Sequence, residues 1–147
     1  MITISLCMIV KNEEEVLDRC LSSIADLMDE IIIVDTGSTD RTKEIARRYT
    51  SKIYDFTWTG NFADARNYSF SKASAQYIYC ADADEVLDAE NHAKFRLLKK
   101  GLLPEIDIVQ MYYCNQLSYN TIYNYDKEYL DLLVETATKN FITAMNY

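Results

Sequence analysis

The feature that most constrains the fold is an alternation of short apolar runs with segments of helical spacing. Four apolar runs have the length expected of buried strands, and they span residues 2–10, 31–34, 52–56 and 76–81. Segments with helical spacing or helix-start signals follow them, at about residues 13–27, 40–49, 62–73 and 91–100. This order predicts an α/β fold with a mostly parallel, Rossmann-like central sheet, right-handed crossovers and helices on both faces.

The alternation weakens from Ile106 onward. Residues 106–117 are expected to form a strand with mixed faces, and residues 126–145 a C-terminal amphipathic helix. The apolar face of that helix could pack on its own sheet or on a second subunit in a homodimer. No internal repeat or low-complexity linker interrupts the chain, so we expect a single domain over residues 1–147.

The balance of charge limits the kinds of partner. The 147 residues include 15 basic and 23 acidic ones, which gives a formal net charge of -8. This charge argues against nucleic acid or an anionic membrane surface as the main partner. It is compatible with a small phosphate ligand, provided that a metal ion or a local basic residue supplies positive charge.

Cysteine usage and the N-terminus favour a cytoplasmic protein. The cysteines form no C-x-x-C pair, which argues against a structural zinc site or a disulfide framework; they are Cys7, Cys20, Cys80 and Cys114. The apolar segment at residues 1–10 is too short to span a membrane and lacks the basic leader of a signal peptide.

Three of the apolar runs end in polar loops, namely Asn12-Glu13, Asp35-Thr36-Gly37-Ser38 and Asp82-Ala83-Asp84. In a parallel sheet all strand-to-helix loops open on one edge, and ligands bind there at the point where strand order reverses. The three loops converge if the second and third strands lie on one side of the first and the fourth on the other. Convergence favours a functional site over the plainer interpretation of an acidic turn before a helix.

The fourth apolar run ends abruptly in the acids Asp82, Asp84 and Glu85. Carboxylates on alternate residues can share one hard divalent cation, whereas they repel each other when no cation is present. A metal enzyme of another class, such as a phosphohydrolase, would need a nucleophilic aspartate after the first strand, where Lys11-Asn12 stands instead.

Four motifs in order resemble a known family. They are SLCMIVKNEE at residues 5–14, VDTGSTD at 34–40, NFADARN at 61–67 and DADE at 82–85. Together they resemble the family 2 inverting glycosyltransferases of the GT-A fold, especially the bacterial branch of SunS-like and lipopolysaccharide-type glucosyltransferases. The resemblance covers about residues 2–117, and the order of the motifs makes it far more specific than a lone D-x-D.

The resemblance implies a nucleotide-sugar donor, most often a UDP-sugar, held with Mg²⁺ or Mn²⁺. Asp82 and Asp84 match the D-x-D motif and would hold the metal. Asp35 matches the acid that contacts the nucleoside, although Thr36 stands where many relatives have a second acid. The full set expected to bind the nucleotide-sugar is Ile9, Val10, Asn12, Glu13, Asp35, Arg66, Asp82 and Ala83.

The plainer interpretations of three candidates stay open at this point. Glu13 also suits a helix N-terminus, and Arg66 could instead pair with Asp64 at close helical distance. His92 is more simply explained as a surface residue than as a base or ligand.

The resemblance also implies inverting transfer to an acceptor, in cell-surface polysaccharide, lipopolysaccharide or peptide glycosylation. Residues 1–117 would then be the N-terminal nucleotide-sugar-binding part, and residues 118–147 a divergent C-terminal segment. In the family the general base normally lies past the D-x-D loop, and none is identifiable in this sequence. The alternative is a truncated nucleotide-sugar-binding module without transferase activity.

Overall fold

The computed structural model describes residues 1–103, 105–109 and 111. The chain divides into two compact units, Met1–Lys100 and Gly101–Tyr147. The strands and helices run in the order β1 Ile4–Val10, α1 Leu17–Ile24, the 3-10 helix η1 Ala25–Leu27, β2 Glu30–Asp35, α2 Thr42–Ala46, β3 Ile53–Asp55, α3 Phe62–Phe70, β4 Tyr77–Cys80 and α4 Ala89–Gly101. All of them lie in the first unit, except for the last residue of α4.

The strands form one parallel sheet in the order β3-β2-β1-β4. Cys7 on β1 lies in register with Ile32 on β2 and with Cys80 on β4. Strand order therefore reverses at β1, with β2 and β3 on one side and β4 on the other, and the predicted α/β fold with a mostly parallel sheet is confirmed.

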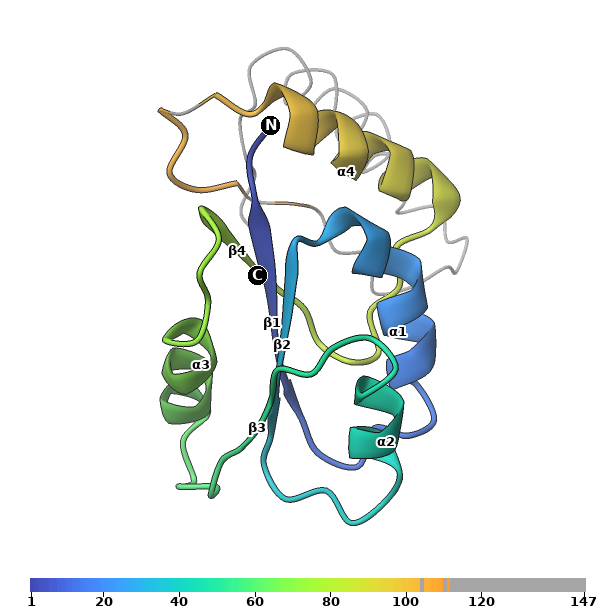
Figure 1. Ribbon diagram of the computed structural model, residues 1–147, viewed down its shortest axis with the longest axis vertical. Helices are drawn as coiled ribbons and strands as arrows, with labels where there is room; N and C mark the ends of the chain where they lie inside the picture. The colour runs from blue at the N-terminus through green and yellow to red at the C-terminus, as the bar shows by residue number, and fades with distance from the viewer. Residues whose placement is uncertain (104, 110, 112–147) are drawn as a thin grey trace, which may run out of the picture. The chain divides into compact units, whose positions relative to one another are not determined.

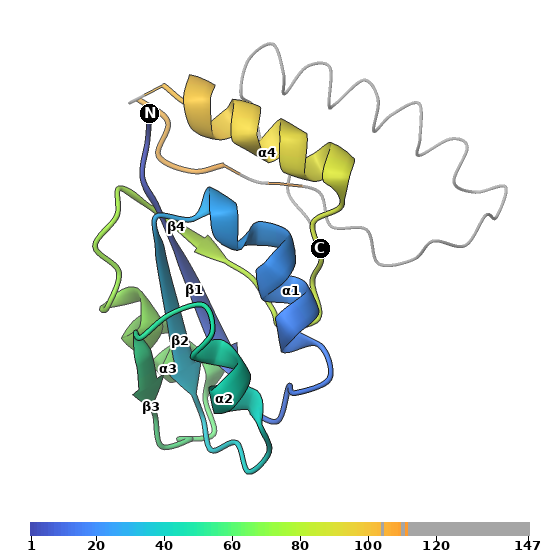
Figure 2. The same ribbon diagram turned by 45° about the vertical axis from the view of Figure 1, so that its right-hand side comes forward.

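Helices cover both faces of the sheet. Figure 1 views the sheet nearly edge-on, with α3 on one face and with α1 and α2 on the other. In Figure 2, α4 again lies beside α1, and its Phe95 ring packs against Tyr79 of β4 at a centroid distance of 5.4 Å. The alternation of strands and helices along the chain thus yields the three layers that both faces of a parallel sheet require.

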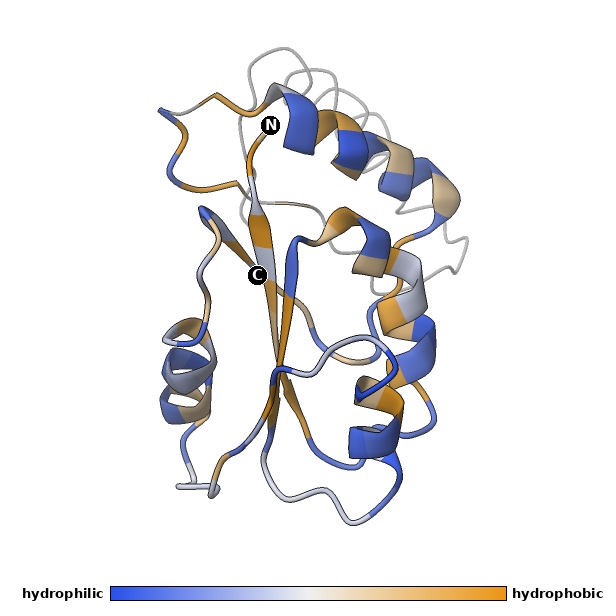
Figure 3. Ribbon diagram, in the orientation of Figure 1, coloured by the Kyte–Doolittle hydropathy of each residue, from blue (hydrophilic) through white to orange (hydrophobic). Residues whose placement is uncertain are grey.

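The core follows the apolar runs that were visible in the sequence. Leu6, Cys7 and Met8 of β1 are completely buried, as are Ile32 and Ile33 of β2. Figure 3 shows the same pattern, with hydrophobic strands between helices whose outer faces are hydrophilic. Burying one such aliphatic side chain contributes roughly 1.5–3 kcal/mol, so these two central strands carry much of the stability.

At the amino edge of the sheet the Glu30 carboxylate is paired through both of its oxygens. Glu30 accepts hydrogen bonds from the Ser5 hydroxyl, the Lys52 ammonium group, and the backbone N–H (2.8 Å) and hydroxyl (3.0 Å) of Ser74. Although burial alone would raise it, these hydrogen bonds lower the pKa of Glu30 to about 2. One carboxylate thus ties β1 and β2 to the segments that precede β3 and β4.

Some predicted boundaries differ from the structure. The first helix begins at Leu17, because Glu13–Val16 form a turn in which the Glu13 carbonyl accepts the Val16 and Leu17 N–H groups. α2 spans only Thr42–Ala46 of the predicted residues 40–49. At its start the Asp40 carboxylate accepts the Thr42 N–H at 2.9 Å, and beyond Ala46 the chain continues as a turn with N–H groups that bond three residues back.

The predicted strand at residues 106–117 is not formed in its described part, residues 106–109 and 111. The rest of that segment and the predicted helix at 126–145 lie outside the described residues. The expected division of the chain at residue 117 stays a prediction.

Candidate functional site

The carboxyl ends of the parallel strands bring the predicted polar loops to one edge. In Figure 1 the chain leaves β1, β2 and β3 at the same, lower end of the sheet, and β4 runs parallel to them. Because β4 flanks β1 on the side opposite β2, the loops after β1, β2 and β4 are neighbours.

The loops after β1 and β2 are joined by hydrogen bonds. The Asn12 N–H donates to the Ser38 hydroxyl at 2.9 Å, and the Asn12 side-chain oxygen accepts the Thr39 N–H at 2.8 Å. Asn12 has a φ of 55°, in the left-handed region that asparagine tolerates better than most residues. The Glu13 N–H donates to the Thr42 hydroxyl at 2.7 Å. The Asn12 amide oxygen is therefore used to join the two loops.

Asp35 is the most deeply embedded acid of this edge. Its side chain is fully buried, and its Oδ2 atom accepts the N–H groups of Gly37 (3.0 Å) and Ser38 (2.9 Å). The second oxygen, Oδ1, is also buried and has no hydrogen-bond partner among the residues that the structure describes. Since a buried acceptor without a partner is costly, this oxygen is suited to accept a hydrogen bond from a ligand.

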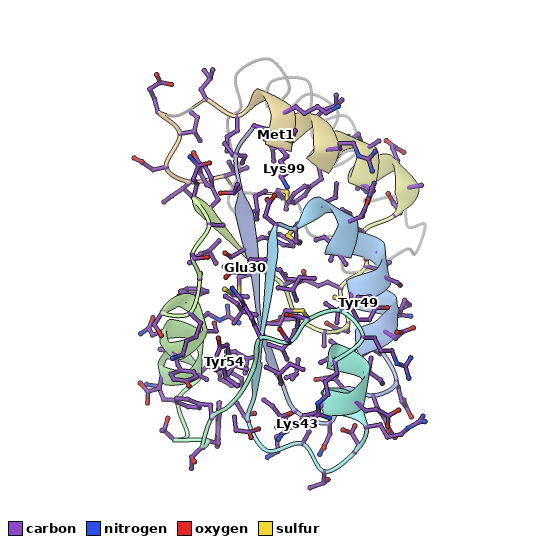
Figure 4. The ribbon with its side chains drawn as sticks, in the orientation of Figure 1. Met1, Glu30, Lys43, Tyr49, Tyr54 and Lys99 are labelled. Carbon is purple, nitrogen blue, oxygen red and sulfur yellow. The ribbon has the colours of Figure 1, made fainter. Side chains whose placement is uncertain are left out.

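Lys43 supplies positive charge beside Asp35. Its Nζ atom lies 3.7 Å from Asp35 Oδ2 and forms an ion pair with Asp55 at the end of β3. Figure 4 shows Lys43 at the lower, carboxyl end of the sheet. The hydrogen bond to Asp55, with a further contribution from the Asp35 charge, raises the pKa of Lys43. No pattern in the sequence indicates a role for this lysine, because its contacts join two separate strand ends.

The hydroxyl of Thr36 points to the backbone at the end of β1. Thr36 is buried, its N–H donates to the Val10 carbonyl at 3.0 Å, and its hydroxyl lies 3.3 Å from the same oxygen. Val10 is itself buried, while Ile9 is half-buried. Thr36 thus closes the end of β1.

The loop after β4 alternates buried alanines with exposed acids. Ala81 and Ala83 are each 4% exposed, whereas Asp82 and Asp84 are exposed. The Cys20 thiol of α1 lies 3.5 Å from the Asp82 carbonyl oxygen, and burial raises the pKa of this thiol to about 12, so that it stays protonated. The buried alanines and the thiol hold the backbone, so that the two carboxylates point to solvent.

Arg66 joins α3 to this loop. Its Nη2 atom lies 3.7 Å from Asp82 Oδ1, and its Nε atom is buried without a hydrogen-bond partner in the described part of the chain. Asp64 instead accepts hydrogen bonds from Thr59 and Asn61. The structure therefore places Arg66 at the acidic loop and does not pair it with Asp64.

The acids of this edge raise one another's affinity for protons. The pKa of Glu13 is raised by burial and then by the charges of Asp84, Asp40 and Asp82. Burial also raises the pKa of Glu85, with Asp82 and Asp84 adding to the effect. A cation bound here would relieve this repulsion.

The donor set fits a divalent cation that is shared with a ligand. Among the described residues, no group of three or more His, Cys, Asp or Glu side chains is arranged to hold a metal. Asp82 and Asp84 offer hard oxygen ligands open to solvent, and Mg²⁺ is commonly held by one or two carboxylates together with substrate phosphates and water. A phosphate-bearing ligand would complete such a site.

His92 lies in another cluster. Its Nε2 atom is 2.7 Å from Asp26 Oδ1, and Arg96 contacts the other oxygen of Asp26 at 3.1 Å. These contacts fasten α4 to η1, as expected of a surface residue.

Comparison with known proteins identifies the family. The family described as "Glycosyl transferase family 2" matches residues 5–142. The chain belongs to glycosyl transferase family 2. The predicted resemblance is thereby confirmed.

Named relatives share the N-terminal region of this family 2 chain. A TPR repeat-containing protein of Synechococcus elongatus is 44% identical over 96 residues, which are 65% of this chain and 24% of that protein. The prophage-derived glycosyltransferase SunS of Bacillus subtilis is 36% identical over 103 residues, with coverage of 68% and 24%. The chain spans about a quarter of the length of these relatives.

Solved structures show the same fold. Glucosyl-3-phosphoglycerate synthase from Mycobacterium tuberculosis, in complex with Mn²⁺ and UDP-glucose, has a TM-score of 0.51 and 25% identity over 58% of this chain and 34% of its own. TarS from S. aureus has a TM-score of 0.61 and 21% identity over 80% of this chain and 38% of its own. These likenesses confirm the predicted GT-A fold. No helix among the described residues is long and apolar enough to cross a bilayer.

Proposed function

We propose that the carboxyl edge binds a nucleotide-sugar donor, with a UDP-sugar as the first candidate. The observation that carries the proposal is the pairing of a buried, unpartnered acceptor, Asp35 Oδ1, with two exposed carboxylates, Asp82 and Asp84, on one edge. Asp35 Oδ1 suits a hydrogen-bond donor of the nucleoside, and the two exposed carboxylates suit a cation that bridges a diphosphate. The synthase of similar fold was solved with UDP-glucose and Mn²⁺.

The other predicted residues would frame this ligand. The backbone of Ile9 and Val10 would border the base, and Asn12 and Glu13 would border the ligand through the loop that they form. Arg66 would balance charge near the diphosphate, because its guanidinium already lies beside Asp82. Ala83 would let the ligand approach the loop backbone, since its side chain is small and buried.

In the proposed reaction the sugar passes to an acceptor hydroxyl or thiol with inversion at the anomeric carbon. A Mg²⁺ or Mn²⁺ ion held by Asp82 and Asp84 would stabilise the charge that develops on the leaving diphosphate. The described residues would bind and orient the donor. An attacking group also needs a general base, and we assign none. Cell-surface polysaccharide, lipopolysaccharide or a peptide is the proposed class of acceptor.

A second candidate is a donor-binding module that does not transfer the sugar by itself. We keep this candidate because we assign no general base among the described residues. We further propose a cytoplasmic location and one domain, with donor binding in residues 1–117 and residues 118–147 as a divergent segment or a homodimer contact. Donor hydrolysis, or transfer to a panel of acceptors, distinguishes the two candidates.

Calorimetric titration with UDP, with and without Mn²⁺, tests donor binding. We expect Mn²⁺ to strengthen binding and Asp84→Asn to weaken it by about tenfold or more, the scale on which metal-site substitutions act. The matched control is Glu90→Gln, which removes an exposed acid on α4 that pairs with Lys94. Binding that is absent, or that ignores both Mn²⁺ and Asp84→Asn, would refute the assignment.

A further inference from the structure

An aromatic pair is exposed in the segment between β3 and α3. Trp58 and Phe62 are 38% and 69% exposed, and they are the only aromatic side chains classed as exposed among the described residues. Their rings meet edge to face, with centroids 4.8 Å apart and planes at 72°. The two rings together form an exposed apolar surface, and such surfaces commonly mark sites of ligand or protein contact.

The segment that carries the pair is ordered by its own hydrogen bonds. Asn61 caps α3, with its side-chain oxygen accepting the Ala63 N–H at 2.9 Å. The Asp64 carboxylate accepts the Thr59 hydroxyl at 2.7 Å and the Asn61 amide at 3.3 Å. The two rings are therefore held in place before any ligand arrives, which lowers the entropic cost of binding.

Helical spacing shows which way Phe62 faces. Phe62 shares one stripe of α3 with Ala65, Arg66 and Ser69, at spacings of three and four residues. Ala65 and Ser69 are buried, and α3 packs on β1 and β2, so this stripe faces the sheet. Phe62 is nevertheless largely exposed at the start of the helix, which indicates that it projects beyond the carboxyl ends of the strands.

The strand order places the pair at the nucleoside end of the proposed ligand. The acids that would hold the diphosphate follow β4, at one side of the sheet, and the pair follows β3, at the other. Between them lies Asp35, in register with Asp55 just before the aromatic segment. The loops after β1 and β2 contain no aromatic residue that could stack on a base. Arg66, one turn along α3 from Phe62, contacts the acidic loop.

We propose that Trp58 and Phe62 form the stacking surface for the nucleobase of the donor. This inference rests on the proposed function and names the group that the aromatic pair recognises. Every nucleobase presents a flat π-face, so stacking adds affinity without choosing among bases. Hydrogen-bonding groups such as Asp35 would instead determine which base is bound.

Trp58 is the only tryptophan of the chain, so its fluorescence reports directly on the proposed contact. With Mg²⁺ as the cation, we expect UDP and uridine to quench its emission and inorganic diphosphate to leave it unchanged. Calorimetry in parallel measures binding independently. If UDP binds by calorimetry while the emission of Trp58 does not change, the stacking proposal is overturned and donor binding stands.

Substitutions give a second test. We expect Trp58→Ala to weaken UDP and uridine roughly tenfold, the scale of losing one stacked aromatic, and Trp58→Phe to retain most of the affinity. Phe62→Ala should act in the same direction, while the affinity for inorganic diphosphate stays unchanged. Leu97→Ala, at a 65% exposed position on α4, is the matched control and should change nothing.

The outcomes separate the two proposals. Full UDP affinity in both Trp58→Ala and Phe62→Ala overturns the stacking surface and assigns the pair to another contact, such as a partner protein. Absence of UDP binding in the unmodified chain overturns the proposed function and this inference together. Circular dichroism checks that each variant is folded. If a variant does not fold, the fluorescence of the unmodified chain tests the stacking proposal instead.

Discussion

The amino and carboxyl edges of the same sheet treat their acidic side chains in opposite ways. At the amino edge Glu30 and Asp29 are paired, and hydrogen bonds from the protein hold the pKa of each below its ordinary value. At the carboxyl edge the pKa values of Glu13 and Glu85 are raised by burial and by neighbouring acids. Figure 4 shows Glu30 and Lys99 well above Lys43, which marks the lower edge.

The difference connects the acids of the amino edge with stability and those of the carboxyl edge with ligand binding. Carboxylates whose partners are protein groups lower the free energy of the folded state, whereas crowded acids without such partners raise it unless a cation binds. Asp35 combines both features, since the backbone satisfies one of its oxygens and no described residue bonds to the other. We therefore expect amino-edge substitutions to change stability and carboxyl-edge substitutions to change ligand affinity.

The largest effect is expected from Glu30→Ala. Removing this carboxylate leaves the Ser74 N–H and the Ser5 hydroxyl without their acceptor, so the free energy of unfolding should fall by about 2–3 kcal/mol. UDP affinity should stay unchanged. Urea denaturation and calorimetry measure the two quantities. The control is Glu44→Ala, whose side chain is 61% exposed and pairs only weakly with Arg48. A loss of UDP affinity at unchanged stability would contradict the division of the edges.

Asp82→Asn should give the reverse pattern. We expect UDP affinity in Mn²⁺ to fall about tenfold, while stability changes by less than about 0.5 kcal/mol, as is usual for a surface substitution. Relief of the repulsion with Glu13 and Glu85 offsets the loss of the Arg66 contact. A clear loss of stability would show that the acidic loop belongs to the fold.

The two edges should also respond to acid with opposite sign. The pKa of Glu30 is lower in the folded state, so its stabilisation is present above about pH 4.5 and is lost as the pH falls toward about 2. With solvent screening allowed for, this loss is about 1–2 kcal/mol. The pKa of Glu13 is raised above 4.5, so its unfavourable contribution disappears as the pH falls through the raised value.

Stability curves against pH check these signs. Glu13→Gln should raise stability at neutral pH and make the curve flatter just above pH 4.5, since it removes a group whose pKa is raised. Glu30→Gln should remove the acid-dependent loss toward pH 2. Identical curves for both variants would refute the contrast.

The smallest effect is expected from Lys43→Met. The substitution removes the positive charge between Asp35 and Asp55, and UDP affinity should fall by about threefold, as for a partly exposed ion pair. Lys43→Arg should restore most of the affinity, because it keeps the charge. If Lys43→Met bound UDP as tightly as the unmodified chain, Lys43 would have no part in holding Asp35 ready for the ligand.

Much of the fold was predictable because its strands are local apolar runs. The loops of Asn12, Asp35 and Asp82 were expected to converge if the second and third strands lay on one side of the first and the fourth on the other, and the sheet has that order. The Glu30 network was not predictable, since its bonds to Ser5 and Ser74 span 25 and 44 residues of sequence and periodicity carries no information about such pairs. Phe62 lies on the stripe of α3 that faces the sheet, and only the structure shows that this stripe extends past the sheet.

Calorimetry with two ligands, UDP and uridine, each with and without Mn²⁺, tests the proposed donor site most directly. In the proposed site the nucleoside contacts groups that the fold already holds, Asp35 and the aromatic pair, and the diphosphate contacts acids that need a cation. We therefore predict that Mn²⁺ strengthens UDP binding by about tenfold or more and leaves uridine binding unchanged. Equal strengthening of both ligands, or of neither, would contradict the proposed site.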